Sequence, residues 1–413
     1  MKIRTHLLLS LTLVAGAQAQ DFNYANTSGT ITITGYTGPG GNVTIPGEIN
    51  GLPVTSIAGG AFRFSGISGA IVPDSVTNIG FQAFAYCQNL TSIEVGALNG
   101  MYTTTEGVLF DKLQSTLIQC PSGKAGVYSV PNGVTTIAEW AFASCDNLKS
   151  ITIPDGVTGI PPHGMYLCHG LTNVNIPNSV NSIGDQAFVD CSSLTSINIP
   201  NSVASIGGDV FDGCGLTCVT IPDTVTSIGQ MAFQSCANLA RVKLPNGITG
   251  IASQMFSRCA SLTNITIPES VANIESAAFA GCTNLAGVYF EGNAPAVGGD
   301  LFNTPISPVV WDPVTVYYLP GSLGWSGTFA GRPTALWLLN ADTSPTTFGF
   351  RNNPFGFTIN WGSGRVIAVE VCTNLATGVW SPVSTNTLIN GLAYFSDPQW
   401  TNYPERFYRI RSP

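Results

Sequence analysis

The chain has 413 residues and a formal net charge of −8, and only 9% of its residues are Asp, Glu, Lys or Arg, against about 25% in an average globular protein. With 15 Lys and Arg residues in all, the composition excludes the basic surface that nucleic-acid binding requires. The same scarcity of charge leaves few groups for acid–base catalysis and predicts a surface rich in Ser, Thr and Asn.

The first 19 residues have the pattern of a secretory signal peptide. Positive charge in Met1-Lys-Ile-Arg4 precedes a short apolar run, Leu7–Val14, and then the small-x-small pattern Ala17-Gln18-Ala19. The apolar run is shorter than the roughly 20 residues that span a bilayer, and no later segment is apolar for long enough. We therefore expect an exported mature chain, secreted or held at the cell surface without a membrane span.

Residues 20–70 are predicted to form an N-terminal cap and a first repeat. Two alternating segments, Thr30–Thr34 and Val43–Ile45, flank a Gly-Pro-Gly-Gly turn at 38–41. This arrangement is typical of a β-hairpin, and a hairpin here would cover the open end of the repeats that follow.

A repeat of 23 residues fills residues 71–292. It is marked by an aliphatic residue followed by Pro, at Val130-Pro131, Ile153-Pro154, Ile176-Pro177, Ile199-Pro200, Ile221-Pro222, Leu244-Pro245 and Ile267-Pro268. One step, the one before Ile221, is 22 residues, and looser copies lie at Ile45-Pro46 and Val72-Pro73. A fixed period of this length predicts a solenoid.

Each repeat has the same apolar pattern. In the copy that starts at Ile176, the segment Leu194-Thr-Ser-Ile197-Asn-Ile199 is L-x-x-L-x-L, the strand signature of a leucine-rich repeat. Alternation points Ile197 and Ile199 inward and Ser196 and Asn198 outward. The segment Gly184–Cys191 spaces Phe and Cys three residues apart, which favours one short helical turn. A single coil cannot bury enough apolar surface to offset its loss of conformational entropy, so neighbouring coils must stack.

These phrases closely resemble the BspA-like leucine-rich repeat proteins, which are exported bacterial surface proteins. The resemblance rests on IPNSVNSIGDQAFVDCSSLTSINIP, on INGLPVTSIAGGAF at 49–62, and on the interruption Tyr102-Thr-Thr-Thr-Glu-Gly-Val-Leu-Phe-Asp-Lys112. The interruption lengthens one step to 35 residues and in that family looks like a hairpin inserted on the stack, here at about 96–129. The resemblance implies a curved solenoid and a role in binding or adhesion, and it does not imply an enzyme.

The C-terminal end of the repeats is predicted at residues 293–340, where Val314–Pro320 keeps the strand-then-Pro pattern. Trp311, Trp325 and Trp337 supply the aromatic area to seal the last coil. Residues 341–413 lack the repeat and are predicted to form an all-β, sandwich-like module. In this module Phe355–Trp361 and Val366–Val371, joined by Gly-Ser-Gly, predict a hairpin.

Eight cysteines share one repeat position, and this set is called the cysteine ladder: Cys87, Cys145, Cys168, Cys191, Cys214, Cys236, Cys259 and Cys282. We expect buried thiols that pack as small apolar side chains. Disulfides between adjacent coils are an alternative, since export permits oxidation. Metal binding is disfavoured because stacked side chains leave the core in parallel rather than converging. Thiol titration of the denatured protein should therefore find most cysteines free.

Other candidates for chemistry are sparse. His163 and His169 are close in sequence but fall in a degenerate repeat, and Cys120, Cys218 and Cys372 lie outside the ladder. No nucleophile elbow, H-E-x-x-H pair or phosphate-binding loop occurs. We predict no catalytic residue, no metal and no cofactor. A carboxylate pair in a cleft between the domains would instead favour a hydrolase.

The outward strand positions are the best candidates for binding. Most are small and polar, as on any solvated strand, but basic and aromatic residues accumulate towards the C-terminal end. The predicted contact residues are Arg241, Lys243, Asn264, Thr266, Tyr289 and Tyr318. Basic and aromatic side chains dominate binding energy at interfaces. We expect this end of the sheet to contact a protein or cell-surface partner, or the protein's own C-terminal β module.

The sequence thus predicts a curved, β-rich α/β leucine-rich repeat solenoid with an N-terminal hairpin cap and a C-terminal β module. The leading function is non-catalytic recognition of a protein or surface through the exposed strand face. The alternatives are carbohydrate binding within a glycan-degrading system and a structural role in an outer layer of the cell.

Overall fold

The structure is a computed structural model, and it describes residues 19–302, 314–338, 340–342, 348–350, 355–362, 365–373, 379–389, 391–402 and 405–411. The predicted signal peptide up to residue 18 and Trp311 lie outside these ranges. The chain divides into two compact units. Unit 1 comprises Met1–Thr263, Asn273–Leu285 and Ala296–Pro313, and unit 2 comprises Asn264–Ala272, Ala286–Pro295 and Val314–Pro413. The predicted domain boundary at 341 therefore falls inside unit 2.

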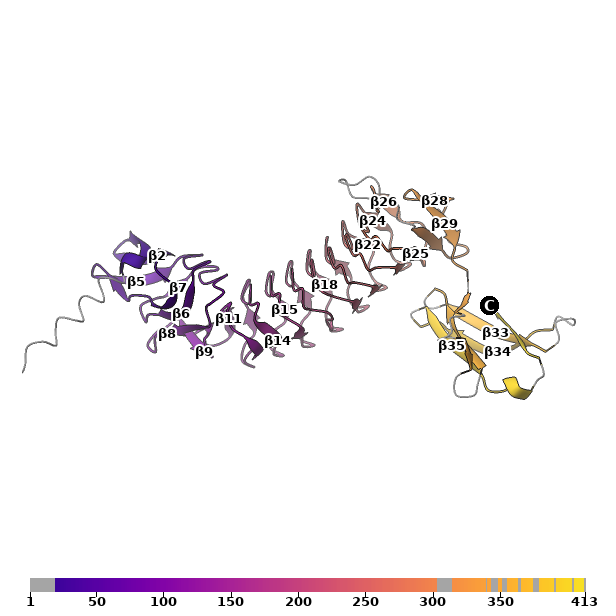
Figure 1. Ribbon diagram of the computed structural model, residues 1–413, viewed down its shortest axis with the longest axis horizontal. Coiled ribbons are helices and arrows are strands. Elements are labelled where there is room, and N and C mark those ends of the chain that lie inside the picture. The colour runs from indigo at the N-terminus through magenta and orange to yellow at the C-terminus, as the bar shows by residue number, and fades with distance from the viewer. Residues whose placement is uncertain are drawn as a thin grey trace, which may run out of the picture. The chain divides into compact units, whose positions relative to one another are not determined.

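Unit 1 is a stack of coils, as the repeat predicts, and each regular coil contributes a strand to a parallel ladder (Figure 1), called here the strand ladder. Its register follows the repeat, because Ser150, Ile151 and Thr152 pair with Asn173, Val174 and Asn175. In unit 1 the strand ladder consists of three successive parallel sheets. The first contains β3 (Gly41–Thr44), β6 (Ile67–Val72) and β8 (Ser92–Val95), the second contains β12 (Gly126–Ser129), β14 (Leu148–Thr152) and β16 (Asn173–Asn175), and the third contains β19 (Cys218–Thr220) and β21 (Arg241–Lys243).

A second parallel ladder of short strands runs through the same coils. Most of these strands contain the Ile that recurs in each repeat, so that Ile160 pairs with Ile183, and Ile183 with Ile206. The strands are β5 (Leu52–Ile57), β7 (Asn78–Ile79), β13 (Thr136–Ile137), β15 (Gly159–Ile160), β17 (Ser182–Ile183), β18 (Ser205–Ile206), β20 (Ser227–Ile228), β22 (Gly250–Ile251), β24 (Asn273–Glu275) and β26 (Ala296–Gly298).

Within unit 1 the strand ladder breaks at the insertion, between β8 and β12, and again at the copy that starts at Ile176, between β16 and β19. Residues 195–199 form no strand, and Ile197 is half-buried rather than buried. The interruption adjoins the 22-residue step, where the segment from Cys214 to Leu216 is one residue shorter than the segment from Cys191 to Leu194. The second ladder continues without a break through the same coils.

The core of unit 1 is a column of aromatic side chains, one from each coil. Phe188, Phe211, Phe233, Phe256, Phe279 and Phe302 follow one another with ring centroids 5.4 to 6.0 Å apart and nearly parallel planes. Met165 takes the same position in the degenerate repeat and is fully buried. Repetition therefore places like side chains against like, as stacking in register requires.

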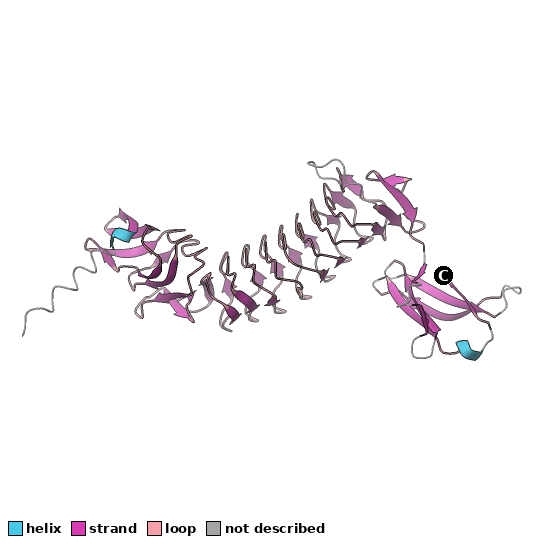
Figure 2. Ribbon diagram, in the orientation of Figure 1, coloured by secondary structure: helices cyan, strands magenta, loops and turns pink. Residues whose placement is uncertain are grey.

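The segment expected to form a helical turn contains no helix (Figure 2). Its amide groups bond to the next coil instead, from Gln186 N–H to Gly208 O (2.8 Å), Phe188 N–H to Val210 O (2.9 Å) and Asp190 N–H to Asp212 O (2.7 Å). Gln186 and Asp190 adopt left-handed backbone conformations, with φ of 57° and 54°. This backbone geometry points every second N–H group along the axis of the stack. Each of these N–H groups can then donate a hydrogen bond to a carbonyl oxygen of the neighbouring coil.

The N-terminal cap contains a β-hairpin, as predicted, but the hairpin is formed by a different pair of strands than expected. Its antiparallel pair is β1 (Phe22–Thr27) with β2 (Thr30–Tyr36), and β2 then pairs in parallel with β5. The segment expected as the second hairpin strand overlaps β3, which pairs in parallel with β6. A two-residue strand, β4 (Glu48–Ile49), flanks β5, and a short 3-10 helix, η1 (Ala19–Asp21), precedes β1.

The insertion has three strands rather than one hairpin. β9 (Tyr102–Thr105), β10 (Val108–Asp111) and β11 (Thr116–Gln119) form an antiparallel meander. β11 then pairs in parallel with β13, so the meander is joined to the second ladder.

Unit 2 contains strand-ladder strands and the C-terminal strands. β23 (Asn264–Ile267), β25 (Gly287–Phe290), β27 (Thr315–Tyr318) and β29 (Arg332–Leu336) pair in parallel, and β28 (Thr328–Phe329) folds back on β29. The ring of Trp325 contacts the rings of Phe290 and Phe329, with centroids 4.9 and 5.1 Å apart. Trp337 is buried. These contacts cover the last coil with aromatic area.

The C-terminal strands form two sheets, which corrects the predicted hairpin. β32 (Phe355–Asn360) pairs with β30 (Asn340–Asp342), β31 (Phe348–Phe350) and β35 (Leu392–Asp397). β33 (Val366–Cys372) pairs instead with β34 (Ser381–Thr387) and β36 (Phe407–Arg411), and a 3-10 helix, η2 (Trp400–Asn402), follows β35. The link between β32 and β33 crosses from one sheet to the other, as in a sandwich.

Candidate functional site

The exposed side of the strand ladder, called here the strand face, is polar and open in unit 1. Asn173 and Asn175 of β16 point outward while Val174 is buried, and Asn173 Nδ2 donates to Ser150 Oγ at 3.0 Å. This is the alternation expected of a sheet that covers the core with one face only.

The two predicted basic contacts lie on this face. Cys218 and Thr220 of β19 pair with Arg241 and Lys243 of β21, so the latter two share one coil. Arg241 is exposed and Lys243 is half-buried. Within the described residues neither has a carboxylate within salt-bridge distance. Both cations are therefore available to an acidic partner.

In unit 2 the predicted outward column is shifted by one residue at its end. Asn264 and Thr266 pair with Gly287 and Tyr289, as expected. Tyr289 pairs with Tyr317, however, and Tyr318 pairs with Phe290 on the opposite side of the strand. The placement of Tyr318 on the strand face is therefore wrong. The irregular loop before β27 breaks the 23-residue spacing, and a shift of one residue exchanges the two faces of a strand.

Tyr289 is engaged within the protein. Its ring stacks on Tyr317 at 4.7 Å and meets Trp337 edge-on at 5.0 Å, and burial raises the pKa of its hydroxyl. Both tyrosines pack against a buried cluster built from β27, the C-terminal strands and their connections: Leu319, Trp337, Phe357, Ile359, Trp361, Ile367, Val369, Leu388 and Phe395. This end of the sheet was predicted to contact either an external partner or the protein's own C-terminal β module. The structure shows the tyrosines in contact with residues of the C-terminal strands.

The cysteine ladder is a column of buried side chains that repeats the same contact. In seven of the eight, Sγ lies 2.9 to 3.2 Å from the carbonyl oxygen of the core Phe or Met of the preceding repeat. Cys145, which follows the insertion, faces Pro121 O at 3.6 Å instead. Burial raises the pKa of most of these thiols, to about 12 for Cys236. Each thiol is thus placed to donate to a carbonyl.

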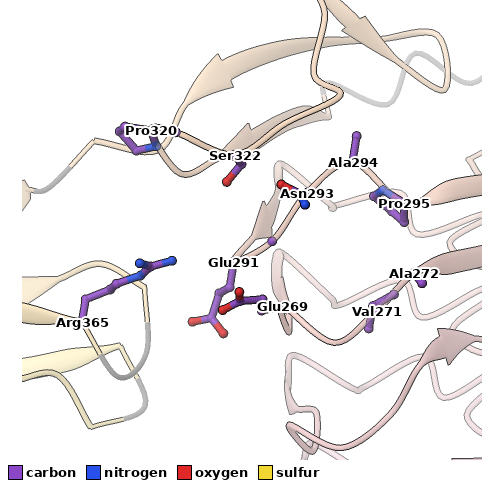
Figure 3. A pocket seen from close by; sticks show the side chains of 12 residues that line it. Glu269, Val271, Ala272, Glu291, Asn293, Ala294, Pro295, Pro320, Ser322 and Arg365 are labelled. Carbon is purple, nitrogen blue, oxygen red and sulfur yellow. The ribbon is translucent and has the colours of Figure 1, made fainter.

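Unit 2 also has a polar pocket of about 470 Å³ (Figure 3). Glu269 and Glu291 project into it from successive coils, and the Arg365 guanidinium points towards them. Asn293 and Ser322 complete its polar lining. Carboxylates, a guanidinium, an amide and a hydroxyl therefore meet in one concave site. The sequence did not predict this site, because its residues come from segments that are far apart in the chain.

Comparison with known proteins decides the family. The model of the BspA type leucine rich repeat region matches six copies, over residues 55–125, 124–238 and 205–307. These ranges cover more than half of the chain. The chain belongs to the BspA-type leucine-rich repeat family.

Solved structures similar to this BspA-type protein include three bacterial leucine-rich repeat proteins. A leucine rich cell surface protein from Faecalibacterium prausnitzii is 26% identical, with 65% of this chain and 86% of that chain covered and a TM-score of 0.37. A protein from Bacteroides ovatus is 21% identical, with 76% and 98% covered and a TM-score of 0.40. The T. pallidum leucine rich repeat protein is 27% identical, with 65% and 89% covered and a TM-score of 0.28. No curated protein matches the chain.

The remaining candidates of this BspA-type protein have separate partners. His169 Nδ1 lies 2.7 Å from Asp146 Oδ1, whereas the His163 ring stacks on Trp140 at 4.0 Å. Cys218 is exposed, and Cys120 and Cys372 are buried. Across the described ranges there is no group of three or more His, Cys, Asp or Glu side chains suited to a metal ion, and no helix there could span a membrane.

Sequence reasoning missed one surface of this BspA-type protein altogether. Phe64, Tyr86 and Trp140 occupy repeat positions on either side of the core Phe, and they lie on the side of unit 1 formed by the turn segments. The sequence does contain an indication of this surface. At the same repeat positions the later repeats mostly have small or polar residues, such as Gln186, Asp190 and Gln254, so the aromatic residues of the early repeats stand out.

Proposed function

We propose that the chain is an exported, non-catalytic adhesion protein that binds a protein or cell surface through the strand face. Three observations support the proposal: the signal-peptide pattern of residues 1–19, membership of a family with cell-surface relatives, and a scaffold whose interior is committed to packing. The observation that carries it is the strand face itself. Its outward residues can change without altering the core, so it can present a recognition surface on an unchanged fold.

Arg241 and Lys243 are the strongest contact candidates on this face. Both are cations without an acidic partner in the described residues, and neighbouring outward residues such as Thr220 are uncharged. Arg in particular is enriched where interfaces concentrate their binding energy. Asn264, Thr266 and the corrected pair Tyr289 and Tyr317 belong to unit 2, and we assign the tyrosines to internal packing rather than to the partner.

The test begins with cell fractionation of the source organism and an antibody to the full chain. The purified mature chain is then applied to immobilised extracellular proteins, and the Arg241→Glu/Lys243→Glu variant is compared with it. We expect binding to fall at least about tenfold, equivalent to about 1.4 kcal/mol. Arg258→Glu is the matched control, because Arg258 is an exposed cation on a turn segment of the same unit. Equal binding by both variants and the wild type would exclude the strand face.

Carbohydrate binding is the second candidate, favoured by the polar pocket of unit 2. Sugars require many converging donors and acceptors, which Glu269, Asn293, Ser322 and Arg365 provide. A glycan-array signal that is lost in Glu269→Gln and kept in Arg241→Glu/Lys243→Glu would assign recognition to this pocket instead of the strand face.

A further inference from the structure

The turn segments of unit 1 present a second surface, called here the turn face. On its N-terminal part six aromatic side chains gather from four coils into what we call the aromatic strip: Phe64, Phe81, Tyr86, Trp140, His163 and Tyr166. Phe64 and Phe81 are 69% and 58% exposed, and the other four are half-buried. Soluble proteins seldom expose contiguous apolar area of this kind without a binding role.

Neighbouring rings of the aromatic strip contact one another along the solenoid, and two pairs of them are stacked. Phe64 lies on Tyr86 with centroids 4.9 Å apart, and Trp140 lies on His163 at 4.0 Å and 11°. Arg63 holds its guanidinium 4.9 and 4.8 Å from the rings of Phe64 and Tyr86. Stacking thus occupies one ring face of each of Phe64, Tyr86, Trp140 and His163. The ring area that remains suits contact with the apolar side chains of a protein better than the flat stacking that a sugar ring would use.

The aromatic strip leads into an acidic pocket. His163 ends the strip and is also part of the lining of a pocket of about 470 Å³, together with Asp185, Gln186, Gly208, Asp209, Gly229 and Gln230. Gly229 packs directly on the neighbouring coil at this place, since a Cβ there would collide with the backbone of Gly208. One oxygen of Asp185 accepts the Gly208 N–H at 2.7 Å. The pocket is therefore a preformed concavity beside an aromatic wall.

The charge of the pocket indicates what enters it. Neither Asp185 nor Asp209 forms an ion pair within the described residues. Asp212, on the same coil as Asp209, has a raised pKa because of burial and because Asp190 and Asp209 lie nearby. Several carboxylates thus share this part of the turn face with no ion pair among the described residues, on a chain whose net charge is −8. A basic side chain beside an aromatic ring gains from both the carboxylates and the ring.

We propose that the turn face binds an extended segment of a partner protein, whose apolar side chains pack on the aromatic strip and whose Lys or Arg enters the pocket between Asp185 and Asp209. The inference rests on the proposed binding function but assigns this ligand to a surface other than the strand face. Trp, Tyr and Arg, all present in or beside the strip, are the residue types that dominate protein interfaces. Failure of this proposal would leave recognition by the strand face intact.

The experiment uses the labelled mature chain on two arrays in parallel, one of random-sequence peptides and one of neutral oligosaccharides. We expect bound peptides to be enriched in apolar residues together with Lys or Arg. Trp140→Ala should weaken binding to a selected peptide at least about tenfold. Asp185→Asn/Asp209→Asn should remove the preference for Lys and Arg while apolar peptides still bind.

Two further variants separate binding from folding. Phe64→Ser/Phe81→Ser changes only side chains that are largely in solvent, so a loss of peptide binding with an unchanged melting temperature supports the proposal. Gln254→Ala is the matched control, because Gln254 holds the position of Trp140 in a later coil. Peptide enrichment without basic residues, binding that no strip variant alters, or oligosaccharide binding that Trp140→Ala abolishes would each overturn it.

Discussion

The cysteine ladder shows how one residue type serves the repeat. Each thiol fills a small space in the core and is placed to donate to a carbonyl oxygen of the neighbouring coil. This weak hydrogen bond gives the buried thiol and the buried carbonyl a partner. The thiol is useful only while protonated. Deprotonation would put a charge into an apolar column, which is why burial raises the pKa of Cys236 to about 12.

Stability should therefore depend on alkaline pH through Cys236. Its thiol in the unfolded chain has a pKa of about 8.5, so above that pH the unfolded state binds fewer protons than the folded state. The stabilising effect is complete below pH of about 8.5 and is lost progressively towards pH 12. Over this range the free energy of unfolding of the wild type should fall more steeply than that of Cys236→Ala, by about 1.4 kcal/mol per pH unit. Urea denaturation with a reducing agent measures both slopes, and identical slopes would contradict the assignment.

The left-handed residues of the turn segments permit a second prediction. Ala277 and Gly281 hold the two left-handed positions of one coil, with φ of 57° and 75°. A residue with a Cβ is strained there by roughly 1–2 kcal/mol, partly offset by the greater flexibility of glycine in the unfolded chain. Ala277→Gly should stabilise unit 1 by about 0.5–1 kcal/mol. Gly281→Ala should destabilise it by a similar amount, since its new Cβ would only touch Arg258. Chemical denaturation measures both, and equal signs would refute the argument.

At the scale of elements, the sequence predicts what repeats and fails where the repeat stops. The strand signature, the core Phe column and the 23-residue period follow from apolar spacing alone. The turn segments were expected as helical turns because a Phe–Cys spacing of three fits either structure; pairing between coils decides the outcome. Tyr318 and the β32–β33 pairing were misplaced where periodicity was lost, because alternation identifies a strand but not its partner.

The candidate binding surfaces also divide into those that regular repeats predict and those that they do not. Arg241 and Lys243 could be placed on the strand face from the sequence, since they lie within regular repeats. The acidic pocket of the turn face and the polar pocket of unit 2 could not, because their shapes depend on turns and on residues distant in the chain. Trp140 and Phe64 are large aromatic residues at turn positions that hold small or polar residues in most repeats, so this part of the turn face is visible in the sequence.

The Phe column gives a prediction for a whole element. Phe233 is fully buried and stacks on Phe211 and Phe256 at 5.4 and 5.6 Å. Phe233→Ala should reduce the free energy of unfolding by about 3–5 kcal/mol, because it leaves a cavity. Phe233→Met should cost less than about 1.5 kcal/mol, since the chain already holds Met165 in this column. Thermal and urea denaturation compare the two; similar losses would mean that the column depends on ring stacking rather than on volume.

For the molecule as a whole, the coil is the unit that can be added or removed. Pairing in register means that a coil contacts mainly its two neighbours, as in other solenoids. The solenoid should therefore tolerate a change in chain length only when whole repeats are added or removed. This is the physical basis for treating unit 1 as a one-dimensional stack, and it can be tested by changing the number of coils.

Deletion of Pro177–Ile199 removes 23 residues and joins Ile176 to Pro200, which restores the repeat phrase. The deletion takes out β17 and the one segment of this region that contributes no strand to the strand ladder. β16 would then meet β19 and β15 would meet β18, with their inward and outward residues still matched. We expect a folded solenoid with a cooperative transition and a slightly smaller dependence on denaturant, since less surface is buried. Deletion of only Pro177–Ala187 shifts every later residue relative to its neighbours. It should expose core side chains, bind a hydrophobic dye and lose cooperativity. Circular dichroism and urea denaturation distinguish the two, and equal behaviour of both deletions would show that the coils are not interchangeable units.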